Sequence, residues 1–516
     1  KNPVSERFEA TTDKAFWKSA AEAGGRDFDS HSFYTSLNAS PLEVGLLARA
    51  LLDNRRRRLD VLPDGEARIE KVGAAQAKAA GIARPVDLYA VAGLGFSPAY
   101  VWLDGQRNVF AVVSGWGALV LEGWEPAVPD LVKAQDAVNA ARLKGLYKEV
   151  ARRPERVLIR NVKLFDPESG KSRPNTSVLT FRNRIEKVGN DREIEIPDSA
   201  EVIEGKGRTL LPGLWDMHVH LGPDDGALDI AAGVTTVRDM ANDTDQLLEM
   251  KRGFDASEMV GPHILMAGFI DGPGPYAGPS KVLVDTEEKA IAAVDRYAQL
   301  GYVQVKLYSS LDPKLVPPIV ERAKKYHLRV SGHIPNGLTA EQAVRAGFNE
   351  IQHVNFLFLN FQDGVDTRTP ARFSEVAEHA AELDLQSDKV REFIALLKER
   401  GTAVDPTLNA FEGMFLSRTG TLDPSLAPVA NRLPLQVRRG LFGGGIVKAG
   451  KEETYRKSYA ALLAMVRALY DAGIPIEAGT DSLAGFNLHR ELELYVQAGI
   501  PAPQVLRIAT LGAAKI

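Results

Sequence analysis

Hydrophobic and polar positions follow three different patterns along this chain, and the changes of pattern predict three regions. In residues 1–153, runs rich in β-branched and aromatic residues lie between two helical patterns, at 13–23 and 129–153. The runs are VDLYAVAGLG (86–95), AYVWLDGQRNVFAVVSG (99–115) and ALVLEGWE (118–125). They predict a small α+β module of unknown role. Its aromatic residues fall within alternating strand patterns, so we expect them in a core rather than on a binding surface.

Residues 154–210 change to short strands separated by turn-forming residues. The strands are RVLIRNVKLFD (156–166), SVLTFRNRIEKVG (177–189) and AEVIEGKGRTLL (200–211), with PESGKSRPN and PDSAE between them. A run of this kind predicts part of a β-sandwich.

From residue 211 to 516, short apolar strands alternate with helical patterns. The expected strands are 212–220, 233–239, 262–268, 302–308, 328–334, 349–354, 402–407 and 475–481. Eight strands with helices between them predict the α/β class and a closed (β/α)8 TIM barrel, whose catalytic groups gather at the carboxyl ends of the strands. Segments 269–280 and 408–454 follow the third and seventh strands and are rich in glycine. They would frame the barrel mouth, either as a lid or as solvent loops.

Charge and composition narrow the classes of partner. The 63 basic and 67 acidic residues give a net charge of -4 without long blocks, which argues against a nucleic-acid partner. The one basic cluster, NRRRRLD (54–60), has no interleaved aromatic residue and is expected to be a solvated helix end. No apolar run reaches the roughly 18 residues that a membrane helix needs, so no membrane span is predicted. The chain starts at Lys1 rather than Met, which leaves a removed leader and trimming during cloning both open. The compartment, periplasmic, secreted or cytoplasmic, is therefore undetermined.

The chain has no cysteine, so a metal site could use only histidine, carboxylate or modified lysine. The stretch LLPGLWDMHVHLGP (210–223) ends the first barrel strand with His218 and His220 on one face. Such a pair alone can be two ordinary histidines. However, the other strand ends carry Lys306 (fourth), His333 (fifth), His353 (sixth) and Asp481 (eighth). Four of the nine histidines thus meet at one rim, and together these residues predict a metal site.

The motifs PGLWDMHVHL, VQVKLY, VSGHIP, EIQHV and EAGTDS resemble those of the amidohydrolase superfamily of metal-dependent hydrolases. The resemblance covers about 156–516. Within the superfamily, the chain also resembles the imidazolonepropionase-like and Xaa-Pro dipeptidase-like branch, but this second resemblance is looser. It implies that 154–210 is the N-terminal part of a composite β-sandwich. Relatives continue past the point where this chain stops, so the C-terminal sandwich strands are absent. We expect either a truncated chain or a partner, a second copy or another chain, that completes the sandwich.

The resemblance also implies two divalent metal ions, usually zinc. His218, His220 and Asp481 would hold the more buried ion, and His333 and His353 the more exposed one. Lys306 would bridge them as a carbamate formed with carbon dioxide. A bare ammonium has no lone pair, whereas a carbamate is an anionic bridge with two oxygens. The alternative for Lys306 is an ordinary salt bridge.

The mechanism implied is attack on an amide carbonyl by a hydroxide that bridges the metals, since coordination lowers the pKa of water to about 7. Asp481 would accept the proton and pass it to the leaving amine. Tyr308 shares a strand face with Lys306 and would either donate to the oxyanion or only pack. His489 and Arg238 are candidate substrate-binding residues. The alternative for His489 is a histidine that only caps or packs at a helix start, and the alternative for Arg238 is a structural ion pair with Asp239.

These expectations combine into an enzyme, a hydrolase of carbon–nitrogen bonds that acts on a small amide or peptide. The favoured activity is cleavage of a dipeptide or an N-acyl amino acid. The alternative activity is that of a cyclic-amide hydrolase or a deaminase. A non-catalytic interaction protein on the same barrel is a third interpretation. It is disfavoured because all six expected ligands are present.

Overall fold

The computed structural model describes residues 5–29, 31–114, 117–279 and 282–516. The expectations about the N-terminal leader, Gly115 at the end of one strand run and Ser280 at the end of segment 269–280 lie outside the described residues. Within the described ranges, no helix combines the length and the apolar character needed to cross a membrane.

The chain begins with an antiparallel sheet of three strands: β1 (Arg7–Ala10), β2 (Lys14–Lys18) and β3 (Ala23–Asp27). The helix expected at 13–23 is therefore wrong. In β2, Ala15 and Trp17 are buried while their neighbours are exposed, a two-residue period that five residues show only weakly. Gly24 of β3 lies under Trp17, where a Cβ atom would come within 2.6 Å of the ring.

A second sheet in this region has seven strands in the order β10-β9-β8-β7-β6-β5-β4, and a helix covers each of its faces. In β8, Val101 and Leu103 pack with helix α1, and Trp102 between them packs with helix α2. The helix expected at 129–153 is confirmed, this region contains both helices and strands, and the basic cluster lies where α1 ends. The bounds are β4 (Ser32–Tyr34), α1 (Glu43–Asp53), β5 (Arg58–Leu62), β6 (Glu66–Ala79), β7 (Ile82–Ala92), β8 (Ala99–Asp104), β9 (Val109–Val113), β10 (Ala118–Val120) and α2 (Val128–Val150).

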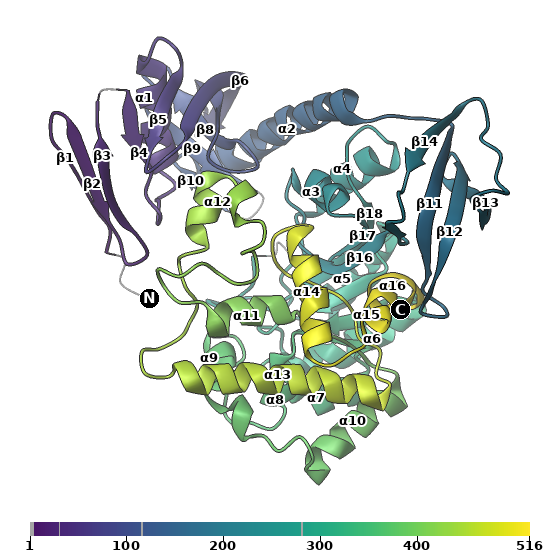
Figure 1. The fold of residues 1–516 in the computed structure, drawn as a ribbon. Coiled ribbons are helices and arrows are strands. Elements are labelled where there is room, and N and C mark those ends of the chain that lie inside the picture. The colour runs from purple at the N-terminus through teal and green to yellow at the C-terminus, as the bar shows by residue number, and fades with distance from the viewer. Residues whose placement is uncertain (1–4, 30, 115–116, 280–281) are drawn as a thin grey trace.

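The strands expected between 156 and 211 form a separate sheet in the order β13-β12-β11-β14, with β15 beside β11. Its small core contains Leu158, Leu179 and Ile194. Figure 1 shows this sheet on the opposite side of the barrel from the N-terminal sheets, with α2 running between them. Completion of a sandwich stays a prediction. The bounds are β11 (Arg156–Asp166), β12 (Lys171–Phe181), β13 (Arg184–Asn190), β14 (Ala200–Glu204) and β15 (Thr209–Leu210).

The remainder is an α/β fold of the TIM-barrel type, with seven parallel strands paired in chain order. They are β16 (Leu214–Val219), β17 (Val234–Asp239), β18 (His263–Ile270), β19 (Gln304–Leu307), β20 (Arg329–Gly332), β21 (Glu350–Gln352) and β22 (Ala403–Asp405). Its helices are α3 (Asp225–Ala231), α4 (Thr244–Asp255), α5 (Glu287–Gln299), α6 (Val316–Lys325), α7 (Ala340–Ala346), α8 (Asn355–Leu359), α9 (Ala371–His379), α10 (Asp388–Arg400), α11 (Leu408–Leu416), α12 (Leu435–Gly440), α13 (Glu452–Ala472), α14 (Phe486–Gln497), α15 (Ala502–Arg507) and α16 (Ala513–Lys515).

The eighth position, 475–481, is not a regular strand, which corrects that expectation. It nevertheless closes the barrel, because the Glu477 N–H donates to Val404 O (2.9 Å) on one side and the Met217 N–H donates to Ala478 O (2.8 Å) on the other. Glycine is needed at position 479 because a Cβ atom there would lie 2.3 Å from a carboxylate oxygen of Asp405.

Candidate metal centre

The carboxyl ends of the barrel strands surround a cavity of about 500 Å³. Histidines, a lysine, an aspartate and a wall of aromatic and apolar side chains line it. The lining residues are His220, Ala241, Phe269, Pro279, Lys306, Tyr308, His333, His353, Arg372, Phe373, Ala410, Phe411, Met414 and Asp481. Five of the six expected ligands therefore face one space, and the sixth, His218, is fully buried beside it.

Asp481 lies among the imidazoles. Its Oδ1 is 3.3 Å from His220 Nε2 and 3.8 Å from His218 Nε2, and its Oδ2 is 3.9 Å from His353 Nε2. His218, His220 and Asp481 each offer a ligand atom within 4.8 Å of the others. The ring of His333 is 4.8 Å from that of His353. The structure thus brings together the residues that the sequence assigned to a metal site.

The Nδ1 atom of each histidine is held by an oxygen, so the Nε2 atom is the one left for a metal ion. The pairs are His218 with Asp405 Oδ2 (2.7 Å), His220 with Ala241 O (2.7 Å), His353 with Thr407 Oγ1 (2.8 Å) and His333 with Ser309 Oγ (3.3 Å). Oxygen partners of this kind fix the tautomer and the orientation of metal-binding histidines.

The protonation states also suit a metal ion. Burial holds the pKa of His218 and of His333 well below the usual range and lowers that of His353 to about 3, so these rings are neutral. Burial would raise the pKa of Asp481, but the nearby His218 and His220 hold it well below its ordinary value. Neutral imidazoles and an anionic carboxylate are the forms that bind zinc.

Lys306 is 1% exposed, and its Nζ lies 3.0 Å from His218 Nε2. Burial lowers its pKa to about 8. Within the described part of the chain, no carboxylate forms an ion pair with it. A buried ammonium without a carboxylate partner is costly, whereas a lysine converted to an anion would match the surrounding ligands. The residues present fit a metal site bridged through this position.

Three of these strand ends carry a left-handed backbone at a residue other than glycine. The φ angles are 69° at His353, 49° at Thr407 and 49° at Asp481. Such a conformation costs about 1–3 kcal/mol per residue and is typical of functional sites, where the surrounding packing enforces it.

Tyr308 lies in the cavity with its ring 3.9 Å from that of His333, and burial raises its pKa. Helix α11, at the start of segment 408–454, supplies Phe411 and Met414 to the wall. That segment therefore frames the barrel mouth, as expected.

The two residues expected to contact the substrate are not among the residues that line the cavity. Arg238 is 3% exposed, and its guanidinium donates to Glu350 (2.6 and 2.9 Å) and to Glu477 (2.6 Å) inside the barrel, away from the cavity lining. It pairs with these residues because its side chain points inward on β17, which also corrects the expected pair with Asp239. His489 is exposed on α14, and its Nε2 bonds the backbone oxygen of Ala232 (2.8 Å).

Four residues around the site were not expected from the sequence: Asp405, Thr407, Ser309 and Arg372. Asp405 and Thr407 lie in TAVDPT, at the carboxyl end of the seventh expected strand, so the rule that found the histidines applied to them too. Arg372 comes from helix α9, where no strand end pointed to it.

The comparisons with known proteins agree with this geometry. A model of the amidohydrolase family matches residues 229–516, more than half of the chain. This chain belongs to the amidohydrolase family. The match includes Lys306, His333, His353 and Asp481, and it begins just after His218 and His220. Membership of a family that is generally metal-dependent agrees with the group formed by His218, His220 and Asp481.

Individual relatives of this amidohydrolase are distant. A dihydroorotase from Clostridioides difficile (strain 630) is 27% identical over 206 residues, which cover 37% of this chain and 46% of that protein. The chain spans between about half and two thirds of the length of the curated relatives it matches first.

Two solved structures share the fold. A protein from Bifidobacterium longum assigned as a prolidase is 20% identical with a TM-score of 0.52, covering 70% of this chain and 84% of that chain. A Xaa-Pro dipeptidase with methionine in its active site is 21% identical with a TM-score of 0.50, covering 70% and 88%. At this identity the likeness supports the barrel fold alone.

Proposed function

We propose that this protein is a metal-dependent hydrolase that cleaves the amide bond of a dipeptide or an N-acyl amino acid. The observation that carries the proposal is the set of four histidines whose Nδ1 atoms are anchored, gathered with Asp481 around the buried Lys306. Family membership supports a hydrolase, and the cavity supports a small substrate.

In this proposal His218, His220 and Asp481 would hold one metal ion, His333 and His353 would hold a second, and Lys306, as a carbamate, would be a further ligand. A nitrogen-rich set of histidines and a carboxylate suits zinc. When bound, the metal ions would polarise the amide carbonyl and lower the pKa of water. At a pKa of about 8, a fraction of the Lys306 amine is neutral near pH 7 and has the lone pair that adds to carbon dioxide.

Two residues of the chain would move or hold protons. Asp481 is anionic at neutral pH and partly exposed to the cavity, so it can accept the proton of the attacking water and return it to the leaving amine. Tyr308 stays protonated because burial raises its pKa, so its hydroxyl can donate to the oxygen on which negative charge develops.

The cavity also supports a carboxylate-bearing substrate. The described residues that line the cavity include one lysine, Lys306, and one arginine, Arg372. Lys306 is buried, whereas Arg372 is partly exposed. Its Nη1 donates to Thr367 O (3.1 Å), which leaves other N–H donors for a ligand. A carboxylate beside the scissile amide would pair with this guanidinium, and Phe269, Phe373 and Phe411 would contact an apolar side chain.

The test is release of amino acids from a panel of dipeptides and N-acyl amino acids by protein reconstituted with zinc and bicarbonate. We expect release by the native protein and none above background by Lys306→Ala, which should also bind less zinc in a competition titration with a chromophoric chelator. Absence of release from every substrate would contradict the proposal and turn attention to cyclic amides and deamination, which the same panel can be extended to include.

A second variant tests the proton transfer. Asp481→Ala should abolish turnover while circular dichroism shows a folded protein. Turnover equal to that of the native protein would refute the role given to Asp481.

A further inference from the structure

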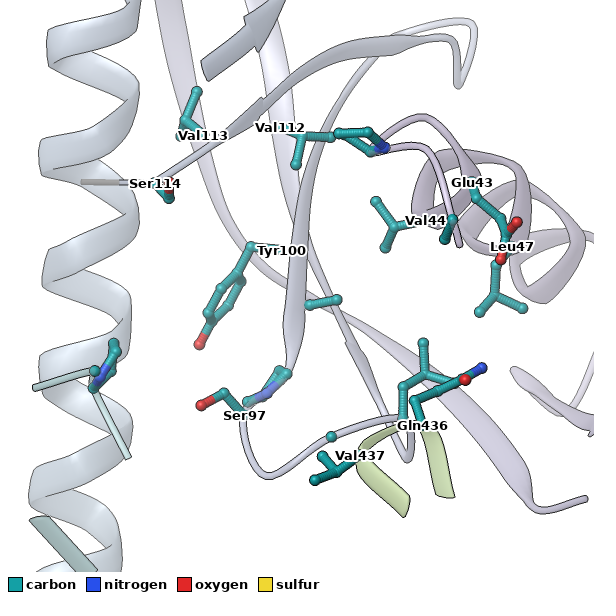
Figure 2. Close-up of a pocket in the computed structure, with 18 of the residues that line it drawn as sticks. Glu43, Val44, Leu47, Ser97, Tyr100, Val112, Val113, Ser114, Gln436 and Val437 are labelled. Atoms are coloured by element: carbon teal, nitrogen blue, oxygen red, sulfur yellow. The ribbon is translucent and has the colours of Figure 1, made fainter. Parts of the chain in front are cut away.

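A second cavity, of about 680 Å³, lies between the N-terminal module and the barrel, and we name it the interdomain cleft. Three parts of the chain line it: the N-terminal sheet with α1 and α2, the barrel segment 221–223 with Gln246, and helix α12. Figure 2 shows Val44 and Leu47 from α1, Val112 from β9 and Val437 from α12 around this hollow. A volume of this size is in the range of sites that hold small ligands or short peptide segments.

The chemistry of the wall limits what the cleft can hold. Among the described lining residues there is no lysine, arginine or histidine, whereas Glu43 and Asp136 are acidic. The wall therefore favours an apolar occupant that is neutral or cationic, and it disfavours an anion.

One buried acceptor near the cleft has no hydrogen-bond donor. Gln135 is 9% exposed and donates from Nε2 to Val113 O (2.9 Å), but its Oε1 is buried and has no hydrogen-bond partner. An acceptor left in this state costs about 1–3 kcal/mol. Because the oxygen has almost no accessible surface, an N–H group bound in the cleft would recover that cost when the Gln135 side chain shifts toward it. A hydrocarbon chain has no such donor, whereas a peptide backbone has one at each residue other than proline.

A third hollow, of about 1040 Å³ beside α2 and α4, has lining residues in common with the interdomain cleft and with the metal cavity. This hollow shares Ser114, Asp136 and Gln246 with the cleft and Pro279 with the metal cavity. Its described lining carries more acidic than basic residues: Asp130, Asp136, Asp243, Asp245 and Glu249 against Lys133 and Arg252. The shared residues make this acidic hollow a neighbour of both cavities, and this adjacency supports a path for a ligand from the metal cavity toward the apolar cleft.

The N-terminal module is fixed against the barrel at this point. Ser97 Oγ and Arg142 Nη2 (2.6 Å) both donate to Asp224, four residues after His220. The two sides of the interdomain cleft are therefore joined by hydrogen bonds, and the cleft is preformed.

We propose that the interdomain cleft is the distal subsite for an apolar oligopeptide, whose C-terminal peptide bond lies in the metal cavity. This inference rests on the proposed function and deepens it from a dipeptidase to a carboxypeptidase of short apolar peptides. The C-terminal carboxylate pairs with Arg372, the chain runs along the acidic hollow, and its cationic N-terminal half enters the cleft. Water adds to the C-terminal amide carbonyl and the C–N bond breaks, giving the shortened peptide and one free amino acid.

The experiment compares three peptides that end in phenylalanine, using the zinc-loaded full chain. They are the dipeptide Leu-Phe, a pentapeptide with four leucines before the phenylalanine, and a heptapeptide with six leucines before it. We expect kcat/KM for phenylalanine release to rise at least tenfold with length. Val437→Trp and Val112→Phe, which fill the cleft from opposite sides, should remove that gain. Arg438→Trp adds the same side chain to α12 at a position outside the lining and should keep the gain.

Binding is measured separately by titration calorimetry on Lys306→Ala, so that failure of the cleft and failure of the chemistry are distinguishable. Tighter binding of the heptapeptide than of Leu-Phe, lost on adding Val437→Trp, supports the cleft even if nothing is hydrolysed. Length-independent affinity, a gain that survives both filling variants, or tighter binding of N-dodecanoyl-phenylalanine than of the heptapeptide would overturn the proposal.

Discussion

At the scale of single residues, Arg372 is the cation that reaches the metal cavity from a helix rather than from a barrel strand. If it binds the substrate carboxylate, Arg372→Gln should raise KM for Leu-Phe about 10–100-fold, since a hydrogen bond to a charged group contributes about 1.5–3 kcal/mol. Leu-Phe amide, which lacks the carboxylate, should show little change. The measurement is a pair of Michaelis curves for each protein, with Arg372→Lys as the conservative variant. An equal loss on both substrates would mean that Arg372 only supports the wall.

The positions of the candidate ligands could be predicted because a strand end fixes both the rim and the face that a side chain occupies. His218 and His220 followed from the two-residue period, and Asp405 was within reach of the same rule. Arg238 misled because inward residues lie in several layers of a barrel, and its layer contains Glu350 and Glu477. Sequence gives the direction of a side chain but not its height along the barrel axis.

At the scale of elements, Arg238 joins several strands from the inside. Its Nε donates to Met217 O of β16 (2.9 Å), and its guanidinium binds Glu350 of β21 and Glu477 of the closing segment. Burial would raise the pKa of Glu350, but Arg238 outweighs it and holds that pKa below the ordinary value. This charge cluster ties the irregular 475–481 segment to regular strands.

Replacing this arginine by a similar-sized apolar residue should destabilise the barrel. Arg238→Met leaves Glu477 buried without its cation and Glu350 with only its 3.4 Å contact to Arg329, which we expect to cost about 3–5 kcal/mol at pH 7. Without Arg238, burial raises the pKa of Glu350 above its unfolded value. The lost stability should then return in part as the pH falls and the carboxyl is protonated in the folded state. Urea unfolding of both proteins at pH 7 and pH 5 measures this, and a difference that grows toward pH 5 would contradict it.

Long strands and helices were predictable because each shows several periods. The pattern at 13–23 was too short to separate a helix from β2 and β3. The segment 475–481 is held by hydrogen bonds to Val404 and Met217, which are distant in sequence. Local pattern cannot contain such contacts.

At the scale of the whole molecule, the bounds of the N-terminal module stay a prediction, and its position beside the barrel could not be predicted because it involves contacts between segments distant in sequence. Asp224 accepts hydrogen bonds from Ser97 and Arg142 and links the module to the barrel. No spacing in the sequence indicates that pairing.

Asp224→Asn should loosen the module without unfolding the barrel, because it removes the negative charge that Arg142 binds. Hydrogen exchange followed by mass spectrometry should show faster exchange in 94–100 and 135–142, and unchanged exchange in the barrel strands. The control, Asp245→Asn, removes an exposed charge from the nearby helix α4. It should leave exchange unchanged in 94–100, in 135–142 and in the barrel strands. Unaltered exchange in 94–100 would show that apolar packing alone holds the module.

The left-handed backbone at His353, Thr407 and Asp481 limits how this protein can be made more heat-resistant. Glycine adopts that backbone without strain, so Thr407→Gly would relax the chain locally, yet it would also remove the hydroxyl that orients His353. The same substitution thus relieves backbone strain and disturbs the candidate metal centre. Selection for heat resistance would meet a trade-off at this rim, and stabilising changes should accumulate elsewhere in the molecule.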